Sequence, residues 1–289
     1  MKIGVHGKEF DKQSVPLIER IFELLGDHEV VISSRFVGHL KHPSFKKFRW
    51  ERYEPGDDLS ALNMMLSIGG DGTLLETVSH TGSYNIPILG INTGRLGFLA
   101  TISRGDTEQA LIQVLKGSYK LDKRSLLRLE SSNQIFGNLN FALNDFTIVK
   151  KDTSSMITIH TFIDGEFLNS YWADGIIVAT PTGSTGYSLS CGGPLIFPRS
   201  QNFVITPVSP HNLAVRPIVL ADSSEISFRI EGRSRKFLVS LDSRVATVDN
   251  TVELKVRKAD FTVSLIQLKD QHYFKTLRQK LNWGLDVRN

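Results

Sequence analysis

A short apolar run that leads directly into a glycine-rich turn is the strongest constraint on the fold of this chain. Residues 64–68 form the run, and residues 69–73 read Gly-Gly-Asp-Gly-Thr. A helical pattern over residues 73–80 follows at once. A buried strand, a sharp turn and a helix in immediate succession are typical of an α/β domain with a parallel sheet.

The turn combines a bare backbone with one carboxylate. Its glycines can take positive φ and let a ligand approach closely, and the N–H groups at the start of the helix can bind an anion. Asp71 places negative charge where a phosphate would lie, which does not suit a plain phosphate cradle. A carboxylate there suits a metal ion, or a proton taken from an attacking hydroxyl. The turn therefore indicates phosphoryl transfer.

An alternative stays open for the turn taken alone. Glycine-rich turns between strand and helix occur in α/β proteins that catalyse nothing. The turn is neither the six-residue dinucleotide fingerprint nor the Lys-bearing P-loop, and no Gly-Lys-Ser/Thr occurs in the chain.

Composition favours a soluble globular protein of one large or two ordinary domains. The chain has 289 residues, of which 40% are hydrophobic and 22% charged. The net charge of +4 suits anionic substrates but is spread too widely for nucleic acid. Lys46 and Lys47, one of the densest basic groups, are expected on a solvated face. We therefore expect no nucleic-acid partner.

The sequence also bounds the cellular setting. Cys191 is the single cysteine, so the chain has no internal disulfide and no multi-cysteine metal site. The first residues indicate a strand and not a signal peptide. Apolar runs stay well short of the roughly 18 residues that a membrane span needs. We expect a cytoplasmic protein without a membrane partner.

Alternating strand and helix patterns fill the first third of the chain. Strands are expected at residues 2–6, 29–32, 64–68 and 86–91, and helices at residues 15–25, 73–80 and 106–116. This alternation predicts a parallel sheet covered by helices over residues 1–122.

Short β-rich runs dominate the chain from residue 123 to residue 267, including residues 140–149, 157–163, 251–256 and 261–265. They predict a second, all-β domain that is antiparallel and sandwich-like. A helical pattern returns at about residues 270–281, so we expect residues 268–289 to pack back on the first domain.

Polar groups gather at strand ends in the second half. Asn144 and Asp145 follow an apolar strand, Asp174 precedes another, and residues 180–187 form a loop rich in Thr, Ser and Gly. Hydroxyl and N–H groups at close range suit sugar hydroxyls, adenine edges or phosphate oxygens. An Asx turn and a hairpin turn with local hydrogen bonds are the structural alternatives.

Taken together, these motifs resemble the NAD kinase family. The resemblance runs in order over roughly residues 60–245: the turn at 69–73, Gly-Ile-Asn-Thr-Gly-Arg-Leu-Gly-Phe-Leu at 90–99, Asn144-Asp145, Asp174-Gly175 with the 180–187 loop, and His211 with Arg216-Pro217. Diacylglycerol, sphingosine and phosphofructo-kinases share the first motif. The combination of residues 92–99 with the 180–187 loop is highly specific.

The resemblance implies phosphorylation of the 2′-hydroxyl on the adenosine ribose of NAD, with ATP or in some members polyphosphate as donor. It also implies a divalent metal, usually Mg²⁺, held by the nucleotide phosphates. Residues 1–122 would bind nucleotide. Residues 123–267 would bind NAD and form a homodimer or homotetramer. The sequence leaves open two other functions: a lipid kinase of the diacylglycerol type and a non-catalytic NADP-binding regulator.

Site roles follow from the resemblance. Asp71 would be the catalytic base. The expected contacts to NAD are Asp71, Gly72, Phe98, Asn144, Asp145, Asp174, Thr182, Thr185, Gly186 and Tyr187. The expected contacts to phosphate or ATP are Gly69, Gly70, Gly72, Thr73 and Arg95.

Overall fold

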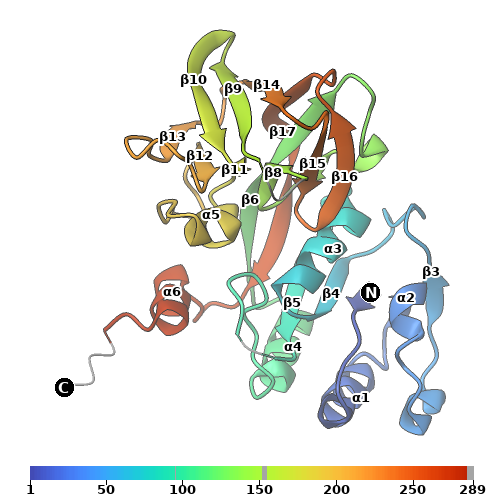
Figure 1. The fold of residues 1–289 in the computed structure, drawn as a ribbon. Helices are drawn as coiled ribbons and strands as arrows, with labels where there is room; N and C mark the ends of the chain where they lie inside the picture. Colours follow the sequence, from blue (N-terminus) through green and yellow to red (C-terminus); the bar gives the residue numbers. More distant parts are fainter. Residues whose placement is uncertain (95, 152–154, 285–289) are drawn as a thin grey trace. The chain divides into compact units, whose positions relative to one another are not determined.

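The computed structural model describes residues 1–94, 96–151 and 155–284. The chain divides into two compact units. Unit 1 comprises Met1–Lys123 and Val263–Asn289, and unit 2 comprises Arg124–Thr262 (Figure 1).

Parallel strands build the sheet of unit 1 in the order β5-β4-β1-β2-β3. The strands are β1 (Lys2–Gly7), β2 (Glu29–Ser33), β3 (Glu51–Tyr53), β4 (Met64–Gly69) and β5 (Ile88–Asn92). The helices are α1 (Val15–Leu24), α2 (Ser34–Val37), α3 (Asp71–Thr81), α4 (Thr107–Leu115) and α6 (Tyr273–Leu281), with 3₁₀ turns η1 (Lys12–Ser14) and η2 (Pro43–Lys47). The expected α/β domain is confirmed, and α6 belongs to it.

Burial explains the apolar run before the glycine turn. Every residue of β4 is buried, as expected for a central parallel strand covered on both faces. Helix α1 presents Ile18, Ile21 and Phe22 to the same core, in the spacing of one helix face. Helix α3 begins two residues earlier than the sequence pattern suggested, so that Asp71 is its first residue.

Antiparallel strands form two sheets in unit 2. One has the order β13-β12-β11-β8-β15-β16; in the other, β10, β9, β14 and β17 are neighbours, and β6 pairs with β17 and β7. The strands are β6 (Lys120–Ser131), β7 (Phe141–Ala142), β8 (Asp145–Lys150), β9 (Ile157–Ile163), β10 (Glu166–Ala173), β11 (Gly175–Ala179), β12 (Asn202–Val208), β13 (Ile218–Ala221), β14 (Ile226–Gly232), β15 (Lys236–Leu241), β16 (Arg244–Asp249) and β17 (Leu254–Gln267). Short helical turns are η3 (Gly137–Leu139), η4 (Gly183–Thr185) and α5 (Tyr187–Ser190).

Both sheets of unit 2 contribute to one core. Phe146 on β8 and Phe203 on β12 lie in the same buried cluster as Ile159 on β9 and Ile226 on β14. Phe146 also packs against Phe228, with 5.8 Å between the ring centroids. The expected antiparallel, sandwich-like domain is confirmed.

Two strand expectations need correction. Residues 140–149 are not one strand, because the chain leaves β7 after Ala142 and enters β8 at Asp145. The backbone N–H groups of Leu143 and Asn144 instead donate to the carboxylate of Asp242. Residues 251–256 and 261–265 are not two strands, because β17 runs continuously through most of both.

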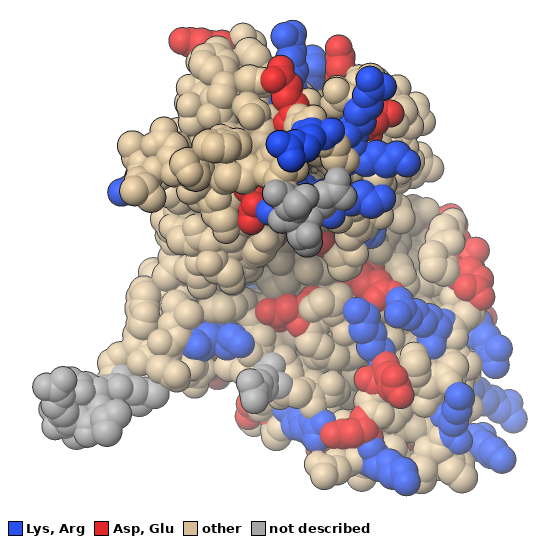
Figure 2. Space-filling model, viewed as in Figure 1, with Lys and Arg blue, Asp and Glu red and all other residues tan. Residues whose placement is uncertain are grey.

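Basic and acidic side chains are interspersed over the lower part of the view in Figure 2. Lys47 shows the pattern: its ammonium lies 2.6 Å from Glu19 and 3.1 Å from Glu23, both on α1. This pairing agrees with a solvated face for Lys47. Among the described residues, no helix combines the length and the apolar character needed to cross a bilayer.

Core packing in unit 2 predicts a contrast between two Phe→Ala variants. Phe146 is fully buried, whereas the Phe167 side chain on β10 is 56% exposed. Phe146→Ala should lower the free energy of unfolding by about 3–5 kcal/mol, and Phe167→Ala by less than about 1 kcal/mol. Urea denaturation followed by circular dichroism measures both. Equal losses would contradict this description of the core.

Candidate active site

The glycine turn leaves the first turn of α3 open. Gly69 ends β4 with φ of 156°, and a Cβ there would lie 2.3 Å from the Thr73 hydroxyl oxygen. At Gly70 and Gly72 a Cβ would meet no heavy atom within 4 Å. The N–H groups of this exposed helix start can therefore receive an anion. The Thr73 side chain is buried against Gly69, so its expected phosphate contact falls to the backbone.

Three backbone N–H groups hold the carboxylate of Asp71. Its Oδ1 accepts from Leu99 at 3.0 Å and Ala100 at 2.9 Å, and its Oδ2 accepts from Phe98 at 2.8 Å. A Cβ at Gly97 would lie 1.9 Å from Asp71 Oδ1, so only glycine permits this approach. The loop residues 93–94 and 96–100 therefore lie around the Asp71 carboxylate, and Oδ2 accepts one of these hydrogen bonds fewer than Oδ1.

Further contacts fix this loop. Asn92 accepts from the Gly94 N–H at 2.7 Å through its side chain. From α6, Lys280 donates to the Leu96 carbonyl at 2.5 Å and stands 5.6 Å from the centre of the half-buried Phe98 ring. The sequence pattern predicted the helix but gave no signal for this role of Lys280. Arg95, an expected phosphate contact, lies outside the described residues.

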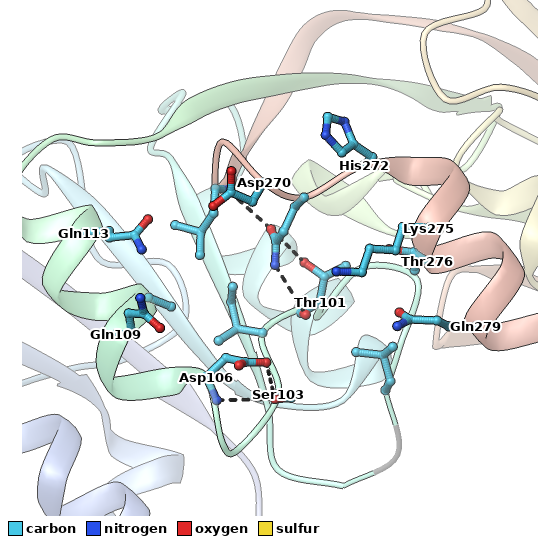
Figure 3. A pocket seen from close by; sticks show the side chains of 15 residues that line it. Thr101, Ser103, Asp106, Gln109, Gln113, Asp270, His272, Lys275, Thr276 and Gln279 are labelled. Atoms are coloured by element: carbon cyan, nitrogen blue, oxygen red, sulfur yellow. Dashed lines mark hydrogen bonds between the residues drawn. The ribbon is translucent and has the colours of Figure 1, made fainter.

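A cavity of about 430 Å³ borders the same loop in unit 1 (Figure 3). Its lining is mostly polar and comes from the loop, α4 and α6, including Thr101, Gln109, Gln113, Lys275 and Gln279. Gln271 donates to the Thr101 carbonyl at 3.4 Å. Asp71 and the glycine turn are not part of the lining formed by the described residues.

In unit 2, Asp242 organises the Asn144-Asp145 turn. Its carboxylate accepts backbone N–H groups from Leu143 at 2.9 Å, Asn144 at 2.8 Å and Asp145 at 3.2 Å. Burial, together with the neighbouring Asp242 carboxylate, raises the pKa of Asp145 to about 7. Burial also raises the pKa of Asp242, against the opposing effect of the N–H groups that it accepts. The turn therefore carries a carboxyl group that changes charge near neutral pH.

The 180–187 loop packs against this turn. Thr180 N–H donates to the Asn144 carbonyl at 2.9 Å. A Cβ at Gly183 would lie 2.0 Å from the same carbonyl oxygen, and one at Gly186 would lie 3.8 Å from Asp145 Oδ2. The side-chain oxygen of Asn144 is buried, and no described residue hydrogen-bonds to it. The structure thus brings together Asn144, Asp145 and Gly186, three of the residues for which we predict contacts to NAD.

The other residues of unit 2 that are expected to contact NAD differ in burial and in the partners they already have. Thr182 is buried and accepts from Arg124 at 3.1 Å, and the Thr185 hydroxyl donates to the Thr182 carbonyl at 3.1 Å. Tyr187 is 44% exposed, and partial burial and Cys191 raise its pKa. Asp174 pairs with Lys150 at 2.6 Å. No sequence motif marked Arg124, which its contact with Thr182 connects to the loop.

Two family models, both of ATP-NAD kinase domains, match the N-terminal and C-terminal parts of the chain. The ATP-NAD kinase N-terminal domain matches residues 3–119, and the ATP-NAD kinase C-terminal domain matches residues 143–268. The NAD kinase of Cytophaga hutchinsonii is 52% identical over 296 residues, and that of Flavobacterium psychrophilum 45% identical over 294 residues. Each alignment covers 100% of both chains.

Solved structures agree on the fold. Yeast NADH kinase complexed with NADH matches with a TM-score of 0.83 at 22% identity, covering 100% of this chain and 89% of that one. An NAD kinase from Archaeoglobus fulgidus in complex with ATP matches with a TM-score of 0.73 at 25% identity, covering 98% and 99%. With the glycine–aspartate turn and the Asn144-Asp145 turn in place and full-length relatives at these identities, the chain belongs to the NAD kinase family.

Proposed function

We propose that this protein transfers the terminal phosphoryl group of ATP to the 2′-hydroxyl on the adenosine ribose of NAD, which gives NADP. Family membership and the NAD kinase relatives support the reaction. The observation that carries the chemistry is Asp71, whose carboxylate stands at the open start of α3 in a fixed orientation. The relatives give no support to a diacylglycerol-type lipid kinase.

Asp71 acts on the attacking hydroxyl. Phosphoryl transfer has a loose transition state, so positioning and charge neutralisation carry most of the catalysis. Oδ2 of Asp71 accepts a hydrogen bond from the 2′-hydroxyl and takes its proton as the new O–P bond forms. The bond between the γ-phosphorus and its bridging oxygen breaks in the same transfer, and ADP leaves. The backbone N–H groups of Phe98, Leu99 and Ala100 keep the carboxylate oriented during this step.

The open helix start binds the donor. Backbone N–H groups at Gly70, Gly72 and the first turn of α3 contact the phosphate oxygens, and Gly69 and Thr73 shape the turn beneath them. The bonds from the 98–100 loop already occupy much of the Asp71 carboxylate, which fits a Mg²⁺ ion that is held by the nucleotide phosphates. Bound there, Mg²⁺ neutralises phosphate charge. ATP is the favoured donor because the Archaeoglobus fulgidus NAD kinase is known in complex with ATP.

Unit 2 offers polar contacts for NAD. The unsatisfied side-chain oxygen of Asn144 and the carboxyl group of Asp145 bind polar groups of the ribose or adenine. In our proposal, further contacts to NAD come from Thr182, Thr185, Gly186 and Tyr187, and Asp174 adds a polar contact. In unit 1, the half-buried Phe98 packs on an aromatic ring of the substrate.

Assembly into a homodimer or homotetramer is part of the proposal. The surface of unit 2 exposes large apolar side chains, among them Phe167, Trp172 and Leu213. Burying such side chains between copies would remove apolar area from water.

Asp71→Asn tests the catalytic base. We expect kcat for NADP formation to fall by about 10²–10⁴-fold, the usual contribution of a general base, and to fall by more than the affinity for NAD. A coupled NADP assay and calorimetry measure the two quantities, and Asp27→Asn, at an exposed position, is the matched control.

A near-normal rate in Asp71→Asn would remove Asp71 from the base role. If the folded wild-type protein made no NADP from NAD with ATP, or with polyphosphate in its place, the proposed function would be wrong.

Asp145→Asn tests the raised pKa. Between its ordinary value of 3.8 and its folded value of about 7, the folded protein keeps a proton that the unfolded chain releases. Release of that proton favours the unfolded chain. The contribution of the protonated Asp145 to the free energy of unfolding is therefore fully present below about pH 4 and is lost as the pH rises through about 7. Asn does not titrate, so the variant should gain up to about 4 kcal/mol relative to wild type between about pH 4 and about pH 8. Urea denaturation across this range measures the difference, and a constant difference would contradict the shift.

A further inference from the structure

Two imidazoles and a carboxylate meet in unit 1. His6 lies on β1, and Glu76 and His80 lie on α3. One ligand atom from each of the three side chains falls within 4.8 Å of the others. Glu76 and His80 stand four residues apart, which places them on the same face of the helix.

Hydroxyl groups orient both imidazoles. His6 Nδ1 lies 2.8 Å from the Ser33 hydroxyl, and His80 Nδ1 lies 2.9 Å from the Tyr53 hydroxyl. Each contact leaves Nε2 as the remaining ligand atom of its ring. Engagement of one ring nitrogen by a polar partner is how proteins fix metal-binding histidines.

His6 Nε2 is a buried atom with no hydrogen bond. The His6 side chain is fully buried, and within the described part of the chain no group hydrogen-bonds to Nε2. Glu76 Oε1 lies 3.6 Å from Nε2, too far for a good hydrogen bond. Leaving such an atom unsatisfied costs about 1–3 kcal/mol, a cost that a bound ion would remove.

We propose that His6, Glu76 and His80 bind a divalent transition-metal ion of the Zn²⁺ class and so tie β1 to α3. Two imidazole nitrogens with one carboxylate oxygen form a known ligand set for Zn²⁺, with a fourth position left for water. Mg²⁺ prefers oxygen ligands throughout, so this ion differs from the one that accompanies ATP. The inference does not depend on the proposed reaction.

Lys8 and Arg35 compete for the same carboxylate. Lys8 lies 3.3 Å from Glu76, and Arg35 also contacts it. Their side chains are 41% and 59% exposed, whereas the Glu76 side chain is 17% exposed. Both cations can turn into solvent when a doubly charged ion takes their place. Removing the Arg35 charge should therefore strengthen metal binding.

Metal titration of the full-length protein tests the site. Wild type freed of metal with EDTA and then desalted is titrated with Zn²⁺ by calorimetry, and with Co²⁺ by visible absorption. We expect one ion per chain and a higher melting temperature with the metal. His80→Gln and Glu76→Gln should each weaken binding by about 100-fold or more, because each removes a ligand. Arg35→Gln should strengthen binding, and His42→Gln, at an exposed histidine, should leave it unchanged.

Two results would overturn the proposal: wild type that takes up no stoichiometric Zn²⁺ at micromolar concentration, or ligand variants that bind as tightly as wild type. Circular dichroism checks that each variant is folded. Should His80→Gln fail to fold, Glu76→Gln and Arg35→Gln decide the outcome, because both side chains reach solvent and the two changes act in opposite directions.

Discussion

Hydrogen bonds from three backbone N–H groups to one carboxylate hold the glycine turn and residues 98–100 together. Asp71 gathers the N–H groups of Phe98, Leu99 and Ala100, and these bonds join the glycine turn to the loop that follows β5. Hydrogen bonds to a charged acceptor are stronger than those between neutral groups. The loop is therefore positioned by the residue that acts on the substrate, so its order and the orientation of the base depend on each other.

In unit 2, a carboxylate likewise accepts hydrogen bonds from three backbone N–H groups. Asp242 gathers the N–H groups of Leu143, Asn144 and Asp145, and here the organised turn presents the polar groups that we assign to NAD. The difference lies in the second carboxyl group. Asp145 stands beside Asp242 in a buried place, and this raises its pKa into the neutral range. In both units a buried or half-buried acid shapes a loop before any ligand arrives.

Local patterns predicted most of the fold and only part of the site. The apolar run at residues 64–68 and the alternation of strands and helices indicated the parallel sheet, because burial and periodicity are local properties. The clasp between Asp71 and residues 98–100 joins positions 27 to 29 residues apart, and the link from Lys280 to Leu96 spans 184. Such contacts leave no mark in a short window of sequence. The break between β7 and β8 was missed for the same reason, since its cause is the distant Asp242.

The glycines of the motifs divide into two kinds. At Gly97 and Gly183 a methyl group would collide with Asp71 or with the Asn144 backbone, so close packing within the protein requires glycine at these positions. Gly70 and Gly72 face empty space, and what they keep clear is room for something from outside. The glycines of these motifs thus meet two different requirements. Alanine at Gly97 or Gly183 would disrupt the fold, whereas alanine at Gly70 or Gly72 would interfere only with a bound ligand.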